Sequence, residues 1–231
     1  MRGLLVVNPN ATSTTPRARE VLVGSLAHQF HLETTTTNHR GHAAELGAQA
    51  RKDGVDCVIV FGGDGTVNEV VNGMVGDHED ISAMPVLGVV PGGSANVFSR
   101  SLGYPQDPIE ATGELIASIR DQRIRTIGLG RADDRWFLCN AGLGMDAEII
   151  AAMEEARSNG RAATPTRYLR TSIAQFFRGT DRKVAPLTVI RPGQDPVRGV
   201  FLAIVQNCSP WTYLGGLEVN PSPDASFDTG L

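Results

Sequence analysis

FGGDGTVNEVVNG, residues 61–73, follows an almost wholly apolar run at residues 55–61. Such a run of β-branched residues is typical of a strand that is buried on both faces of a parallel sheet. After the glycines, apolar residues recur at helical spacing: Val67, Val70, Val71 and Met74. Gly73 and Gly76 are both candidates to end this helix. The stretch therefore predicts a central strand that runs through a glycine-rich turn into a helix.

The turn itself combines three glycines with Asp64 and Thr66. Glycine lets a ligand approach the backbone closely, and the N–H groups and dipole at a helix N-terminus favour an anion such as phosphate. Asp64 would repel a phosphate unless a cation lies between them or the carboxylate orients a hydroxyl or water. We therefore interpret the stretch as a nucleotide-phosphate site that works with a divalent metal. The alternative is an ordinary turn in which Asp64 caps the helix.

Composition limits the classes of protein that this chain can belong to. It has 231 residues, 41% of them hydrophobic and 20% charged, with a net charge of −4. These values exclude a disordered chain and a basic nucleic-acid binder, so we expect no nucleic-acid partner. Its three isolated cysteines lie in apolar runs, which indicates buried free thiols in a reducing compartment, without a disulfide or zinc. No run of about eighteen apolar residues occurs, so we expect any membrane contact to be peripheral.

Residues 1–121 alternate strands with helices. Strands are expected at residues 4–7, 31–37, 55–61 and 85–90, and helices from Pro16, at residues 43–52, at 95–102 and at 105–118. This pattern predicts a doubly wound parallel sheet in an α/β domain. Ligands of such sheets collect at the carboxyl ends of the strands, which makes Asn8 and Asn10 candidate contacts, with simple turn residues as the alternative; Thr37 lies at the same end of the second strand.

A second glycine-rich turn, PGGSAN at residues 91–96, follows the fourth expected strand. Ser94 is placed to cap the helix expected at 95–102. Two such turns in one parallel sheet face the same edge, and this pair strengthens the phosphate-site interpretation. Arg100 on that helix either reaches an anion or is simply an exposed arginine.

From residue 122 the pattern changes to a β-rich one. We expect a domain boundary near Asp121, a hairpin over residues 124–140, a helix opening at 142–148, another helix at 168–177 and strands at 183–190 and 197–206. Basic residues gather between Arg157 and Lys183, where they form either a peripheral membrane face or a solvated surface. This second domain, 122–231, is expected to be incomplete at its C-terminus.

The two glycine-rich turns, with their continuations, resemble the diacylglycerol kinase catalytic-domain family, which includes sphingosine and ceramide kinases and soluble bacterial lipid kinases. Residues 142–147, GLGMDA, look like the third motif of that family, and residues 221–231 resemble the fourth. The GGDGT element alone is shared with NAD kinases and, loosely, phosphofructokinases. The continuation at residues 67–69 and the loop at residues 94–96 favour the lipid kinases.

The resemblance implies an NAD kinase-like or phosphofructokinase-like α/β nucleotide domain followed by a β-rich, sandwich-like lipid-substrate domain. By motif position, ATP would be bound by Asn8, Thr37, Gly62, Gly63, Asp64, Gly65, Thr66, Asn68, Glu69, Ser94 and Asn96. The same positions imply a substrate contact at Asp146 and a magnesium-associated loop at Ser226, Asp228 and Leu231. Arg100, from its place on the helix after the second turn, is the other candidate substrate contact.

The activity implied by the resemblance is transfer of the γ-phosphate of ATP, with Mg²⁺, to a lipid hydroxyl, most simply of a diacylglycerol. That chemistry belongs to phospholipid biosynthesis. It implies a cytoplasmic protein that is peripheral at the inner face of the membrane, where its lipid substrate lies, and a homodimer is an option. The rivals are an NAD kinase-like enzyme with a soluble substrate and a non-catalytic module that binds nucleotide or membrane.

Three departures from the family pattern carry expectations. Val97 stands where many bacterial members have an acid, and Thr229 stands where the magnesium-associated loop usually has one. The family's general base falls beyond Leu231, so no catalytic base is assigned and Asp64 is the fallback candidate. We therefore expect weak activity from these 231 residues alone.

Overall fold

A computed structural model of the chain describes residues 1–77, 82–158, 171, 185 and 187–229. The chain divides into two compact units. The first is formed by residues 1–139 together with 207–229, and the second by residues 140–206. The division into domains at Asp121 was drawn from the change of sequence pattern, and it stays a prediction.

The first unit is built on a parallel sheet of four strands, as the alternating pattern predicts. These strands are β1 (Arg2–Val7), β2 (His31–Thr36), β3 (Cys57–Gly62) and β4 (Val86–Pro91). They lie in the order β2-β1-β3-β4, and every pairing is parallel. In this register Val7 pairs with Phe61, and Gly62 pairs with Pro91. The turns after β1, β3 and β4 therefore start at the same edge of the sheet.

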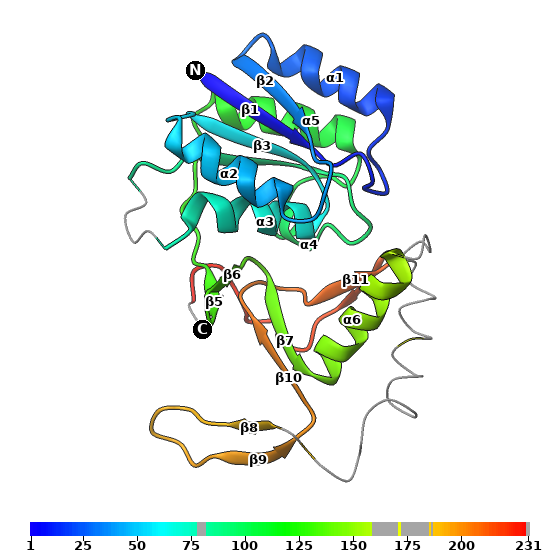
Figure 1. Cartoon of the computed structure of the whole chain (residues 1–231), viewed down its shortest axis with the longest axis vertical. Coiled ribbons are helices and arrows are strands. Elements are labelled where there is room, and N and C mark those ends of the chain that lie inside the picture. Colours follow the sequence, from blue (N-terminus) through cyan, green and yellow to red (C-terminus); the bar gives the residue numbers. More distant parts are fainter. Residues whose placement is uncertain (78–81, 159–170, 172–184, 186, 230–231) are drawn as a thin grey trace. The chain divides into compact units, whose positions relative to one another are not determined.

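Helices cover both faces of this sheet (Figure 1). On one face, α1 (Pro16–Leu26) and α5 (Pro108–Arg120) pack with Leu5 and Val7 of β1. On the other, α2 (His42–Lys52) and α3 (Asp64–Val75) pack with Leu4 and Val6. Because side chains alternate along a strand, the apolar run of β1 supplies both layers of the core. The α/β class expected from the sequence is thus confirmed.

The backbones of α2 and α3 touch through two glycines. A Cβ atom added at Gly73 would lie 1.9 Å from the carbonyl oxygen of Ala44, and one at Gly47 would lie 2.3 Å from that of Val70. Gly73 therefore lies within α3, where the lack of a side chain lets α2 pack closely against it. The suggestion that Gly73 ends the helix is wrong. Gly76 is the C-terminal cap, and its N–H donates to the carbonyl of Asn72.

The predicted hairpin after residue 122 is shorter than expected. It consists of β5 (Gly130–Ala132) and β6 (Arg135–Phe137), which pair antiparallel. Residues 124–129 form no strand. The first unit also holds α4 (Val97–Ser101), which lies within the helix expected at 95–102. A second antiparallel hairpin, β11 (Thr212–Leu214) with β12 (Leu217–Val219), was not predicted from the sequence.

In the second unit, β7 (Asn140–Gly144) pairs antiparallel with β10 (Leu202–Gln206), and α6 (Met145–Ser158) follows β7 directly. The helix expected from residue 142 thus starts three residues later, because 140–144 are paired in a strand. The single strand expected at 197–206 is two, β9 (Val197–Val200) and β10, and β9 pairs with β8 (Leu187–Val189). The helix expected at 168–177 and most of the basic cluster lie outside the described residues.

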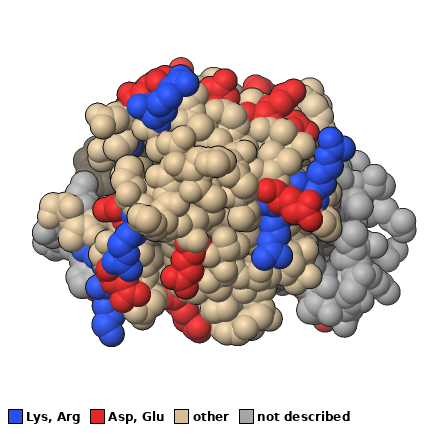
Figure 2. Space-filling view, turned by 90° about the horizontal axis from the view of Figure 1, so that it is seen from above, with Lys and Arg blue, Asp and Glu red and all other residues tan. Residues whose placement is uncertain are grey.

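Acidic and basic side chains are interspersed on the face shown in Figure 2, in small groups of either sign. Among the described residues, none of the helices is both long enough and apolar enough to span a membrane.

The close contact of α2 and α3 makes Gly73→Ala a sensitive substitution. We expect a loss of about 1–3 kcal/mol in the free energy of unfolding, because the added methyl group must push the two backbones apart. Gly113→Ala in α5 is the matched control: its Cβ meets nothing within 4 Å, so it should gain about 0.5–1 kcal/mol of stability. Urea unfolding measures both, and equal effects of the two substitutions would contradict the packing described.

Candidate functional site

Two glycine turns lie against each other at the carboxyl edge of the sheet. The first, residues 62–65, joins β3 to α3, and the second, residues 91–96, joins β4 to α4. The N–H of Gly92 donates to the carbonyl of Gly62 at 2.8 Å. A Cβ atom at Gly93 would lie only 2.7 Å from the Cα atom of Gly63. Only glycine at these positions allows the two turns to approach so closely.

The start of α3 is open. Gly63 occupies the N-cap position, and no side chain in the part of the chain that the structure describes caps the helix there. The N–H groups of Thr66 and Val67 donate back to the carbonyl of Gly63, whereas within the described ranges the N–H of Gly65 has no acceptor. A Cβ atom at Gly65 would meet nothing within 4 Å. An exposed N–H at the positive end of a twelve-residue helix is suited to bind an anion.

Asp64 joins the two turns. Its carboxylate accepts hydrogen bonds from the N–H groups of Val97 (3.1 Å) and Phe98 (2.9 Å), the first two residues of α4. Burial raises the pKa of Asp64 and outweighs these backbone hydrogen bonds, which lower it. The alternative of an ordinary turn, in which Asp64 caps a helix, is therefore correct about capping. The helix that the carboxylate caps is α4, however, and not α3, to which Asp64 belongs.

This arrangement corrects the prediction for Ser94. The helix begins at Val97, with Asn96 at the N-cap in the left-handed region (φ 49°), so Ser94 is not its cap. The side chain of Asn96 instead closes the turn, accepting from the N–H of Gly93 and donating to its carbonyl, each at 2.8 Å. The Ser94 hydroxyl lies 3.1 Å from that of Thr12.

The loop after β1 completes the same edge. The amide nitrogen of Asn8 donates to the hydroxyl of Thr66 at 2.8 Å, so the structure brings these two predicted residues together. The N–H of Ser13 donates to the carbonyl of Gly92 at 2.7 Å. Thr12 was missed by the sequence analysis, although the polar run after a buried strand was a usable signal for it.

Glu69 and Asn68 support the site from α3. The Glu69 carboxylate accepts a hydrogen bond from the N–H of Gly41 at 3.2 Å. This bond connects α3 to the loop that begins at Thr37, directly after β2. Asn68 binds the hairpin instead: its amide donates to the carbonyl of Trp136 and accepts from the N–H of Leu138. Contact of these residues with a nucleotide stays a prediction.

The remaining predicted residues are spread more widely. The guanidinium of Arg100 stacks 3.0 Å above the ring centre of Tyr213 in β11. Asp146 is the second residue of α6, in the second unit, and its side chain is outside the described residues, as is Leu231. Ser226 and Asp228 lie in a turn of the first unit.

All three cysteines are buried and free, as predicted. Burial raises the pKa of the Cys57 thiol to about 12. A hydrogen bond with Cys208, together with burial, raises the pKa of Cys139. Because the reactive form of cysteine is the thiolate, Cys57 and Cys139 are structural groups and not candidate nucleophiles.

Removing the Asp64 carboxylate should loosen the second turn. Asp64→Ala leaves two N–H groups without acceptors, and we expect it to cost about 1–3 kcal/mol of unfolding free energy and to move the amide signals of Val97 and Phe98. Asp64→Asn keeps one acceptor and should cost less. Asp224→Ala removes an exposed acid and is the control. Urea unfolding and amide NMR are the measurements, and unmoved Val97 and Phe98 signals in Asp64→Ala would refute the capping role.

Comparison with known proteins identifies relatives of this chain. Residues 2–132 match the family model described as the diacylglycerol kinase catalytic domain. A diacylglycerol kinase of Bacillus subtilis is 32% identical over 157 residues, which cover 64% of this chain and 47% of that protein. A Stenotrophomonas maltophilia protein named "Probable lipid kinase YegS-like" is 28% identical over 209 residues, covering 83% of this chain and 64% of the relative.

The fold agrees with this relationship. The crystal structure of a diacylglycerol kinase from Bacillus anthracis superposes with a TM-score of 0.64 at 30% identity, covering 94% of this chain and 67% of the other. The chain spans about half the length of several curated relatives, from 41% to 50%. Because the family model covers more than half of the chain, this protein belongs to the diacylglycerol kinase catalytic-domain family.

Proposed function

We propose that this chain provides the nucleotide site of an ATP-dependent lipid kinase, which transfers the γ-phosphate of ATP to a lipid hydroxyl, with a diacylglycerol-like lipid as the favoured acceptor. Membership of the family supports the kinase activity. The names of the Bacillus subtilis and Bacillus anthracis relatives support the acceptor. The proposal places the enzyme in the cytoplasm, at the membrane surface that holds its lipid; a homodimer stays a prediction.

The pair of joined glycine turns is the observation that carries this proposal. A triphosphate is a chain of anions, and it needs several N–H and hydroxyl donors that converge on one place. The N–H of Gly65 and the hydroxyls of Ser94 and Thr12 are such donors at one edge of the sheet. In our proposal these groups hold the phosphates, and Asn8 contributes by fixing Thr66.

Mg²⁺ would accompany the nucleotide and neutralise charge on the transferred phosphate. Among the described residues, no group of three or more histidine, cysteine, aspartate or glutamate side chains is placed to hold a metal ion. The phosphates and several retained waters would then supply most of the ligands, as is common for Mg²⁺ in nucleotide sites.

Asp64 in this proposal positions the phosphate site and does not take the proton of the lipid hydroxyl. Its two acceptor contacts with Val97 and Phe98 orient the carboxylate toward α4. A general base must lie within hydrogen-bond reach of the proton that it removes, and a carboxylate committed to two backbone donors is poorly placed for that role.

Nucleotide binding is tested by Gly65→Ala. The new methyl group meets no protein atom within 4 Å, so the fold should be unchanged, whereas it would crowd a phosphate bound at this N–H. We expect the affinity for Mg·ATP, measured by calorimetry, to fall about tenfold, which corresponds to about 1.4 kcal/mol. Gly24→Ala, at another open helical position, should bind as the wild type does. Wild-type affinity in Gly65→Ala would contradict the proposed phosphate contact.

The acceptor is tested by transfer of radiolabelled γ-phosphate from ATP to diacylglycerol, sphingosine or phosphatidylglycerol in vesicles, or to NAD in solution, by the protein at its natural length. Labelling of diacylglycerol supports the proposal. Labelling of NAD alone would favour a soluble-substrate kinase, and nucleotide binding without any transfer would favour a non-catalytic module.

A further inference from the structure

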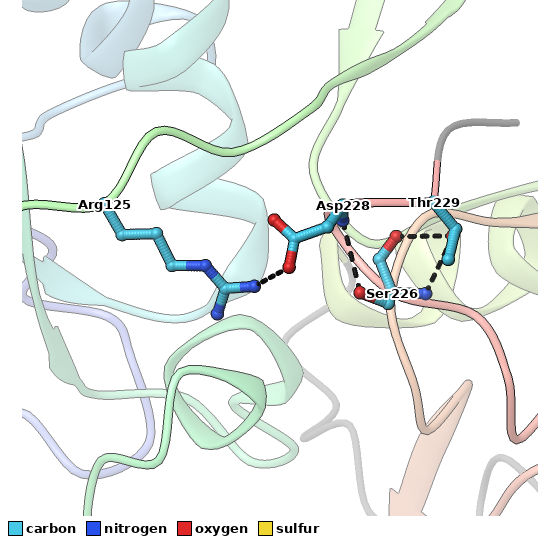
Figure 3. Close-up of polar contacts among 4 residues, drawn as sticks. All are labelled: Arg125, Ser226, Asp228 and Thr229. Atoms are coloured by element: carbon cyan, nitrogen blue, oxygen red, sulfur yellow. Dashed lines mark hydrogen bonds and ion pairs between the residues drawn. The ribbon is translucent and has the colours of Figure 1, made fainter.

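The turn at residues 226–229 is where the family resemblance implies a magnesium-associated loop. Its polar groups bind one another (Figure 3). The Ser226 hydroxyl accepts from the N–H of Asp228 at 3.2 Å, and the Thr229 hydroxyl donates to the carbonyl of Ser226 at 2.9 Å. The turn is thus closed by its own hydrogen bonds.

Arg125 supplies the positive charge beside this turn. Its guanidinium forms an ion pair and a hydrogen bond with the carboxylate of Asp228, as Figure 3 shows. Arg125 belongs to the segment between α5 and β5, 103 residues earlier in the sequence. Both side chains remain about half exposed, at 52% for Arg125 and 62% for Asp228.

These residues do not fit a bound Mg²⁺. The ion requires a near-octahedral shell of oxygen ligands and is usually held by one or two carboxylates. In the described part of this turn Asp228 supplies the carboxylate, because position 229 holds threonine, and that carboxylate is already paired with a guanidinium. A guanidinium stays charged at every accessible pH, so a divalent cation on the same carboxylate would be repelled.

We propose that Arg125 closes this turn in place of a divalent cation, so that the turn is held without metal. The turn is linked to the glycine turns through Phe227, the residue between Ser226 and Asp228. The side chain of Phe227 is buried. Its carbonyl accepts from the N–H of Gly128 at 3.0 Å, and its ring packs edge-on against Phe98 at 5.6 Å. Phe98 is one of the two residues that Asp64 binds, so Arg125 acts as a positioning residue for α4.

Melting temperatures of the full chain test this inference at matched ionic strength, in EDTA and in millimolar MgCl₂, without nucleotide. The wild type should melt at the same temperature in both. Arg125→Gln should lower the melting temperature by about 1–4 °C in either buffer, a small but measurable shift because the ion pair is exposed. Exchanging the pair, Arg125→Asp with Asp228→Arg, should restore it. Arg17→Gln, at an exposed arginine of α1 that forms no ion pair with another described residue, should leave it unchanged.

Broadening of amide NMR signals by Mn²⁺ reports directly on metal at the turn. We expect the signals of residues 226–229 to stay sharp in the wild type. Mn²⁺ broadening confined to these residues, or a rise of the wild-type melting temperature in MgCl₂ that Asp228→Asn abolishes, would overturn the inference. An Arg125→Gln variant that melts like the wild type would overturn it as well. None of these measurements depends on kinase activity, so they are independent of the proposed function.

Discussion

The contact between the Asp64 carboxylate and the first two N–H groups of α4 holds the candidate site together. A helix of five residues has little stability of its own, because its nucleation is costly and few internal hydrogen bonds form. Asp64 satisfies two of its unpaired donors from another turn. The glycine turn of β4 is thereby fixed against that of β3, and the absence of side chains at Gly63 and Gly93 allows the contact.

Helix α3 is the element on which these contacts converge. Its first turn carries Asp64, its glycine at position 73 admits the backbone of α2, and two asparagines bind the β5–β6 hairpin. Asn72 both accepts from the N–H of Trp136 and donates to its carbonyl, so it pairs with the hairpin backbone as a neighbouring strand would. The donors offered to an anion at the start of α3 are therefore held on a rigid support, which reduces the ordering cost of binding.

The sheet and the meeting of the two glycine turns at its edge were predictable because both depend on local signals. Buried strands appear as continuous apolar runs, and parallel strands must end at one edge. The roles of single polar residues were less predictable. Ser94 is the local candidate to cap α4, but the actual cap, Asp64, is more than thirty residues away in the sequence. Asn68 matches a family motif, yet its amide is used by Trp136 and Leu138. Side-chain partners that depend on tertiary contacts leave no periodic signal.

A crystal structure of the chain with a non-hydrolysable ATP analogue is the most direct test of the central claim, that the two joined turns form one phosphate site. We predict a phosphate oxygen within hydrogen-bond distance of the Gly65 N–H, with the Ser94 hydroxyl among its other donors, and the bonds from Val97 and Phe98 to Asp64 intact. An analogue bound away from both glycine turns, or one whose binding breaks the Asp64 contacts, would contradict the account.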